Sequence, residues 1–258
     1  MPEGASDYQK AKFKSQYDSL SEIGSTFKDF VPAVFDYSGT SYSMEFLDGY
    51  KAFHQLSKAN RMKLIQKVFS KLSALYELKV KSDADWLTAF MKDKIFSKEP
   101  VVAGFNLGDT QKLMKLFESI LANKLKEVSP QFLCRYIHGD LTYENILVKD
   151  SDIRFIDLDN DNKPGPPELD LGKLTQSILT QYEHWDDKEF DISNKDEFDV
   201  VTEFYSRLLN QPIAQIKNKA YFYCAIHLFR MIPYQFKRNP SRAQMAFDFC
   251  IDYLKMIK

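Results

Sequence analysis

A short hairpin with acidic residues beyond both ends constrains the fold of this chain most, because most other apolar patterns in the sequence are helical. The apolar run at residues 146–148 precedes a polar turn, and a second run follows at residues 153–156. Two short runs rich in β-branched residues about a polar turn predict a β-hairpin. The chain therefore has to combine helices with at least one antiparallel strand pair.

Helical spacing of apolar residues covers most of the remaining chain. It predicts a first helix over residues 8–23, ended by Gly24, and helices over residues 52–126 with a break at 100–108. It returns from Leu169 onwards, interrupted by the acidic loop 186–191 and by three prolines, Pro212, Pro233 and Pro240. Between these stretches, residues 30–47 predict another hairpin around Gly39. The predicted class is α+β with a large helical part.

Composition excludes several kinds of protein. The 258 residues are 44% hydrophobic, and 35 basic against 36 acidic residues give a net charge of −1, so neither nucleic acid nor an anionic membrane is expected as a partner. Cys134, Cys224 and Cys250 form no metal-binding or disulfide spacing and are expected to be reduced. There is no apolar run of about 18 residues and no signal-peptide pattern, so we expect a cytoplasmic protein.

The stretch around the second hairpin carries the candidate chemistry. Asp140 and Asn145 lie five residues apart in an expected loop, and the hairpin returns the chain to deliver Asp157 beside them. Two carboxylates and an amide oxygen, with no cysteine nearby, form the oxygen-only set that Mg²⁺ prefers. A carboxylate that is not engaged by the metal can accept a proton from an attacking hydroxyl. Phosphoryl transfer needs this division of roles.

Residues 136–159 resemble the catalytic and metal-binding segments of the aminoglycoside phosphotransferase and choline kinase superfamily, relatives of protein kinases. The sequence has the pattern HGD-x4-N, then a hairpin and IDLD. The resemblance implies a protein-kinase-like fold of the aminoglycoside phosphotransferase type, with ATP and Mg²⁺ as cofactors. It implies that Asp140 is the catalytic base, that Asn145 and Asp157 bind the metal, and that His138 holds the loop.

Two flanking segments are similar to the same family. Residues 42–49 resemble the strand and hinge between its lobes, so the backbone of Met44, Glu45, Phe46 and Leu47 would contact adenine. Residues 166–174 resemble a segment in which Asp170 would brace the catalytic loop. Residues 138–147, 170–179 and 227–233 are also similar to segments of bacterial phosphotransferases encoded with surface-polysaccharide genes.

The N-terminal part departs from the family pattern. No Gly-rich loop and no strand with a phosphate-binding lysine precede the first expected helix, and Gln16 stands where the family has a glutamate. We therefore expect a truncated or missing N-terminal β-lobe, with residues 1–49 forming a reduced remnant of a helix, a strand pair and the hinge. Residues 50–258 are expected to form a helical C-lobe with the catalytic loop and the metal-binding hairpin. Either an upstream segment or a protein partner completes the N-lobe, or the chain is a degenerate kinase.

The acceptor is expected to be a small molecule with a hydroxyl group, such as a sugar, choline or another amino alcohol, or an aminoglycoside-like compound. Acids and aromatics around the expected site could hold a cation or a sugar. The acids are Glu144, Asp159, Asp161, Glu168 and Glu183, and the aromatics are Tyr143, Tyr182, Trp185, Tyr221 and Tyr223. Of these, Glu144 and Asp159 could contact substrate or metal. The alternatives are a kinase-shaped binding or regulatory module and, with weaker support, a metal-dependent phosphate hydrolase.

Overall fold

The computed structural model describes residues 7–81, 85–159, 164–186 and 194–258. Packing divides the chain into two units, one made of residues 1–79 and 134–165 and the other of residues 80–133 and 166–258. We call them unit 1 and unit 2. The lobe boundary expected after residue 49 falls inside unit 1. It stays a prediction, because a packing unit and a kinase lobe are not the same division.

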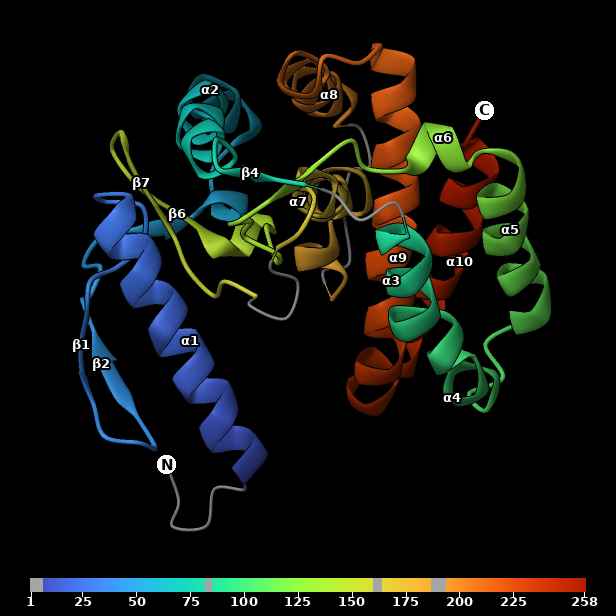
Figure 1. The fold of residues 1–258 in the computed structure, drawn as a ribbon, viewed down its shortest axis with the longest axis horizontal. Helices are drawn as coiled ribbons and strands as arrows, with labels where there is room; N and C mark the ends of the chain where they lie inside the picture. Colours follow the sequence, from blue (N-terminus) through green and yellow to red (C-terminus); the bar gives the residue numbers. More distant parts are fainter. Residues whose placement is uncertain (1–6, 82–84, 160–163, 187–193) are drawn as a thin grey trace. The chain divides into compact units, whose positions relative to one another are not determined.

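Unit 1 begins with helix α1 (Asp7–Thr26), which packs on the strand pair β1 (Val34–Tyr37) and β2 (Tyr42–Met44) (Figure 1). The antiparallel register pairs Val34 with Met44 and Tyr37 with Tyr42. The ring of Tyr17 on α1 stacks on Tyr37, with the ring centroids 5.1 Å apart. The first predicted hairpin is therefore present, and aromatic contacts hold it against the helix.

Gly24 does not end the first helix as the sequence predicts, because α1 continues to Thr26. A glycine inside a helix costs about 1 kcal/mol relative to alanine, which packing can offset. Here Leu20 and Ile23 are buried, and a Cβ at residue 24 would lie 3.5 Å from the side chain of Val31. The tertiary contacts of this turn thus outweigh the local stop signal.

The second predicted hairpin is also present and belongs to a three-stranded antiparallel sheet in the order β3–β6–β7. The strands are β3 (Lys51–Ala52), β6 (Ile146–Lys149) and β7 (Asp152–Phe155). Asp150 in the two-residue turn has a φ of 54°, as a tight turn between right-twisted strands requires. After β3, a short 3-10 turn (Phe53–Gln55) leads into helix α2 (Lys58–Leu75).

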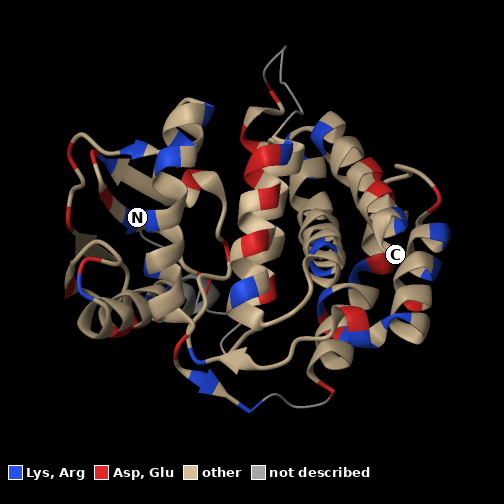
Figure 2. Ribbon diagram, turned by 90° about the horizontal axis from the view of Figure 1, so that it is seen from above, with Lys and Arg blue, Asp and Glu red and all other residues tan. Residues whose placement is uncertain are grey.

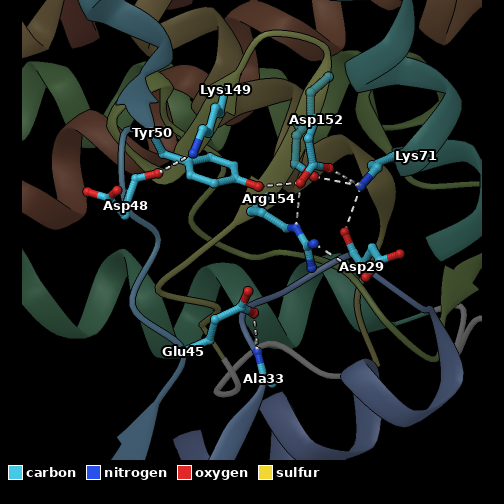
Figure 3. A network of polar contacts seen from close by, with 10 residues as sticks. Asp29, Ala33, Glu45, Asp48, Tyr50, Lys71, Lys149, Asp152 and Arg154 are labelled. Carbon is cyan, nitrogen blue, oxygen red and sulfur yellow. Dashed lines mark hydrogen bonds and ion pairs between the residues drawn. The ribbon is translucent and has the colours of Figure 1, made fainter.

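A network of polar contacts joins the segment before β1 to β7 and α2 (Figure 3). Lys71 on α2 donates hydrogen bonds of 2.6 Å to the carbonyl oxygens of Asp29 and Ile153. Arg154 on β7 forms ion pairs with Asp29 at 3.3 Å and with Asp152 at 3.0 Å. The network therefore fixes the hairpin that leads to Asp157 within unit 1.

The chain passes between the units within the short strands β4 (Lys79–Val80) and β5 (Leu133–Cys134), and again between Gly165 and Pro166. Unit 2 is helical. Its helices are α3 (Trp86–Lys94), α4 (Glu99–Ala103), α5 (Thr110–Asn123), α6 (Leu125–Val128), α7 (Pro167–Thr175), α8 (Lys195–Leu209), α9 (Ile213–Arg238) and α10 (Pro240–Met256). A 3-10 turn (Phe96–Lys98) precedes α4, a π-helical turn (Gln176–Thr180) continues α7, and a 3-10 turn (Tyr182–His184) follows.

Helix α9 forms the core of unit 2 and packs chiefly against α10 and α7 (Figure 1). Gly172 on α7 allows the closest approach, since a Cβ there would lie 2.6 Å from the backbone of Tyr223. Pro233 does not interrupt the helix as the sequence predicts, because α9 runs through it to Arg238. Pro212 caps the start of α9, and Pro240 begins α10, so only these two mark helix ends.

The three cysteines are free and buried. None of the helices in the described ranges is both long and apolar enough to cross a membrane.

Candidate functional site

The candidate site in unit 1 is built from two segments that hydrogen bonds hold together. One is the loop from His138 to Asn145, and the other is the chain that leaves β7, residues 156–159. The N–H of Ile156 donates to the carbonyl of Asn145 at 3.1 Å, and the N–H of Asp159 donates to the carbonyl of His138 at 2.9 Å. Asp157 lies between these two bonds. The structure therefore brings the three predicted chemical residues, Asp140, Asn145 and Asp157, into one region.

Asn145 is buried and turned toward Asp140. Its amide Nδ2 donates to the backbone oxygen of Asp140 at 2.8 Å and lies 3.4 Å from the carboxylate Oδ2. Because Nδ2 faces this loop, the Oδ1 atom of the planar amide faces away from it. That oxygen is the atom a hard cation would use.

His138 is fully buried, and its side chain contacts both the loop and strand β7. Its Nδ1 accepts a hydrogen bond from the backbone N–H of Asp140 at 3.3 Å, and its ring meets Phe155 edge to face with the ring centroids 5.9 Å apart. These contacts fit the predicted role of holding the loop. They also tie the position of Asp140 to strand β7.

Asp157 is exposed and has a φ of 56°, in the left-handed region. Non-glycine residues in this conformation are uncommon and gather at functional sites. Asp157 lines a cavity of about 170 Å³ with Gln16 and Leu20 of α1, Tyr42 and Met44 of β2, and Leu158. The pKa of Tyr42 is raised, first by burial and then by the negative charge of Asp157. The cavity is smaller than the roughly 300–1,000 Å³ of most ligand sites, so it could take only part of a nucleotide.

The four predicted adenine-contacting residues are the last residue of β2, Met44, and the three that follow it. Met44 is half exposed, and Phe46 is 86% exposed. The N–H of Glu45 donates to the carbonyl of Ala33 at 2.7 Å, while its Oε2 accepts from the N–H of Ala33 at 3.1 Å (Figure 3). The Glu45 N–H is therefore engaged within the strand pair, and the adenine contact of the four residues stays a prediction.

Other predicted residues have different surroundings. Glu144 and Asp159 are partly buried at the two segments of the site. Asp170 is fully buried in α7, within unit 2, and its bracing of the loop stays a prediction. Asp161 and most of the acidic loop 186–191 lie outside the described residues.

Two residues grouped with the acceptor site from sequence belong to the core. Glu168 is fully buried and forms an ion pair of 2.7 Å with the equally buried Lys219. Tyr223 is also fully buried, and its pKa is raised well above the ordinary value by burial and by the charge of Glu168. The spacing of residues in the sequence did not predict the ion pair between Glu168 and Lys219.

Sequence reasoning missed the contacts of Glu22. It forms an ion pair of 2.8 Å with Arg135 and accepts a hydrogen bond from the hydroxyl of Tyr136. Gln16 of α1 lines the same cavity as Asp157, while Glu22 binds the segment before the loop.

The donor set suits a magnesium ion only with ligands from a bound nucleotide. Across the described ranges, no three His, Cys, Asp or Glu side chains cluster closely enough to hold a metal ion. Mg²⁺ in phosphotransfer sites is commonly held by one or two carboxylates with substrate phosphates and water. Asp157 and the amide oxygen of Asn145 fit that pattern.

No protein-family model matches the chain, and no curated protein matches it in sequence. The fold matches solved structures of small-molecule kinases. The gentamicin complex of APH(2'')-IIa is 16% identical, with a TM-score of 0.63, and the match covers 96% of this chain and 82% of that one. ADP-bound aminoglycoside phosphotransferase APH(2'')-Ib is 17% identical, with a TM-score of 0.60 and coverage of 97% and 83%.

An ethanolamine kinase from Plasmodium vivax is 15% identical, with a TM-score of 0.58, and the match covers 97% of this chain and 71% of that one. At these identities the likeness shows the fold. It confirms the predicted structural resemblance to the aminoglycoside phosphotransferase and choline kinase superfamily and the mostly helical, kinase-like architecture.

Proposed function

We propose that this protein is an ATP- and Mg²⁺-dependent phosphotransferase that phosphorylates a hydroxyl group of a small molecule. The observation that carries the proposal is the hydrogen-bonded pairing of the loop 138–145 with residues 156–159. It places Asp140, Asn145 and Asp157 in one region of a fold shared with small-molecule kinases. One of these neighbours binds ADP, which supports a nucleotide as the phosphoryl donor.

In this proposal the hydroxyl oxygen of the acceptor attacks the γ-phosphorus of ATP, and Asp140 accepts the proton that this hydroxyl loses. The bond to the β-phosphate oxygen breaks, and ADP leaves. Asp157 and the Asn145 oxygen would hold Mg²⁺, which would neutralise negative charge on the phosphates. His138 and Asp170 are positioning residues. Glu144 and Asp159 face the acceptor or the metal.

We infer that the acceptor carries amino groups as well as hydroxyls. The neighbours named for gentamicin and ethanolamine act on or bind such compounds, and Glu144 and Asp159 supply carboxylates near the loop. A carboxylate stabilises an ammonium group by a charge-assisted hydrogen bond. We keep the cytoplasm as the proposed location.

A kinase-shaped binding module is the second candidate. Gln16, and not a glutamate, lines the cavity together with Asp157. A neutral amide cannot form the ion pair that fixes a phosphate-binding lysine. Losing such a lysine would remove one electrostatic contribution to the transition state, and losing one donor costs roughly 3–4 kcal/mol in other active sites. In this version the chain is a degenerate kinase that binds nucleotide with little turnover.

Thermal unfolding with and without nucleotide tests the proposal. ATP with Mg²⁺ at about 100 times its dissociation constant is expected to stabilise the fold by about 2.7 kcal/mol. If ATP, ADP and GTP all leave the unfolding temperature unchanged, the proposal of nucleotide binding is wrong. If a shift is seen, release of ADP in the presence of aminoglycosides, choline, ethanolamine and sugars separates the enzyme from the binding module.

A further inference from the structure

Helix α2 of unit 1 carries charged side chains of one sign only. Its residues Lys58–Leu75 include Lys58, Arg61, Lys63, Lys67 and Lys71 and no aspartate or glutamate. Figure 2 shows the distribution of charge along the ribbon, with Lys and Arg in blue and Asp and Glu in red. The whole chain has a net charge of −1, so overall composition does not explain this concentration.

Part of this charge faces a cavity of about 540 Å³ in unit 1, away from the residues of the candidate site. Three lysines from three elements line it: Lys51 of β3, Lys63 of α2 and Lys149 of β6. Asp150 is the acidic residue in its lining, so the lining side chains sum to a charge of +2. Ammonium groups that share one cavity repel one another unless an anion lies between them.

The lysines surround an apolar floor. Leu56, Leu64 and Val148 line the same cavity, and Val148 pairs with Lys51 across the β3–β6 ladder. Ligand sites of this volume combine apolar walls with a few placed polar groups. The arrangement therefore suits a molecule with an apolar body and an anionic group.

Local contacts hold two sides of the cavity in place. Lys149 reaches over Gly49 and donates to the carbonyl oxygen of Asp48 at 2.9 Å, as Figure 3 shows. Ser57 caps α2 by accepting from the N–H of Asn60, and Asn60 lines the cavity. The first turn of α2 thus faces the same space, and the positive end of its helix dipole adds to the attraction for an anion.

We propose that this lysine-lined cavity is a second binding site, for a small organic phosphate: a phosphate monoester attached to an apolar group. A dianionic phosphate matches the charge of +2, and the leucine and valine floor takes the apolar group. The site is separate from the proposed phosphotransfer site and does not depend on it.

Isothermal titration with phenyl phosphate, in the absence of nucleotide and Mg²⁺, tests the site. The wild-type protein is expected to bind one equivalent, more tightly than inorganic phosphate, and benzyl alcohol is expected not to bind. Lys63→Gln and Lys51→Gln are each expected to weaken binding by about tenfold, because each removes a charge-assisted hydrogen bond. Lys67→Gln, one turn further along α2 and outside the cavity, is the matched control and should bind like the wild type.

Other outcomes overturn the proposal. If phenyl phosphate does not bind at millimolar concentration, the cavity is not an anion site. Equal losses in Lys67→Gln and Lys63→Gln would mean that the diffuse charge of α2 attracts the anion. If Lys63→Gln and Lys51→Gln bind like the wild type while Asp157→Asn binds more tightly, the phosphate occupies the proposed nucleotide site, where removing the carboxylate relieves charge repulsion.

Discussion

The backbone N–H of Asp159 donates a hydrogen bond to the carbonyl oxygen of His138 across 2.9 Å. Between His138 and Asp140, Gly139 has a φ of +81°, and a Cβ there would lie 2.7 Å from the carbonyl oxygen of Asp159. The segment that carries Asp157 can therefore lie against the loop that carries Asp140 because residue 139 has no side chain.

Gly139→Ala is expected to destabilise the protein and to separate these two segments. Left-handed backbone costs an alanine roughly 1–2 kcal/mol, and the clash with Asp159 adds about 1–3 kcal/mol. Gly39→Ala is the matched control, because Gly39 has a φ of +86° but nothing within 4 Å of the position of a Cβ. Urea denaturation followed by circular dichroism measures both, and equal losses of stability would show that the clash is relieved without cost.

Asp157→Asn is expected to abolish the Mg²⁺ dependence of nucleotide binding, because an amide lacks the charge that holds the metal. Asp150→Asn is its control. Asp150 is also exposed and has a φ of 54°, so the same change in the same backbone conformation occurs away from the site. Titration of ATP with and without Mg²⁺ compares the two variants. Unchanged Mg²⁺ dependence in Asp157→Asn contradicts its role as a metal ligand.

Asp140→Asn is expected to lower the turnover number strongly while nucleotide affinity survives. General acid–base catalysis contributes roughly 100- to 10,000-fold, and asparagine cannot accept the proton. The backbone N–H of Asp140 donates to His138 and its carbonyl oxygen accepts from Asn145. Neither bond requires the carboxylate, so the loop should stay folded. ADP release and ATP titration on the same preparation separate the two effects, and retained turnover would remove Asp140 as the base.

The site region could be predicted from sequence because its parts are close in the chain. Asp140 and Asn145 share one loop, and a hairpin with a two-residue turn has only one way to return Asp157 to that loop. Local patterns of turn and strand residues carry this information directly. Gly24 and Pro233 were misjudged for the opposite reason, since burial in tertiary contacts kept α1 and α9 continuous.

Long-range pairs left no signal in the sequence. Glu168 and Lys219 are separated by 51 positions and meet only because α7 packs on α9. From sequence, Glu168 was one of several acids near the acceptor, while its partner was an unremarked lysine. The same holds for the lysine-lined cavity, whose lysines come from β3, α2 and β6.

Lys219→Met is expected to destabilise the protein by about 3–5 kcal/mol near neutral pH, because it leaves a buried carboxylate without its partner. Burial already raises the pKa of Glu168, and losing Lys219 raises it further. In the unfolded chain the carboxyl group of Glu168 ionises above about pH 4.3. In the folded variant this carboxyl group stays protonated to higher pH. The stability lost relative to the wild type should therefore grow as the pH rises. The double variant Glu168→Gln/Lys219→Met should recover most of the loss, and urea denaturation at several pH values checks both.

His227 is expected to make the protein less stable in mild acid. Its Nε2–H donates to the carbonyl oxygen of Leu169 at 3.0 Å and joins α9 to α7, and burial lowers its pKa well below the ordinary value. The unfolded chain binds a proton below about pH 6.5, whereas the folded protein keeps the ring neutral. Stability therefore falls as the pH drops from about 7 to 5, by at most about 1.4 kcal/mol per pH unit. His227→Gln can still donate to Leu169 but does not titrate, so urea denaturation should show a flatter pH dependence, and an unchanged slope would assign the acid sensitivity to other groups.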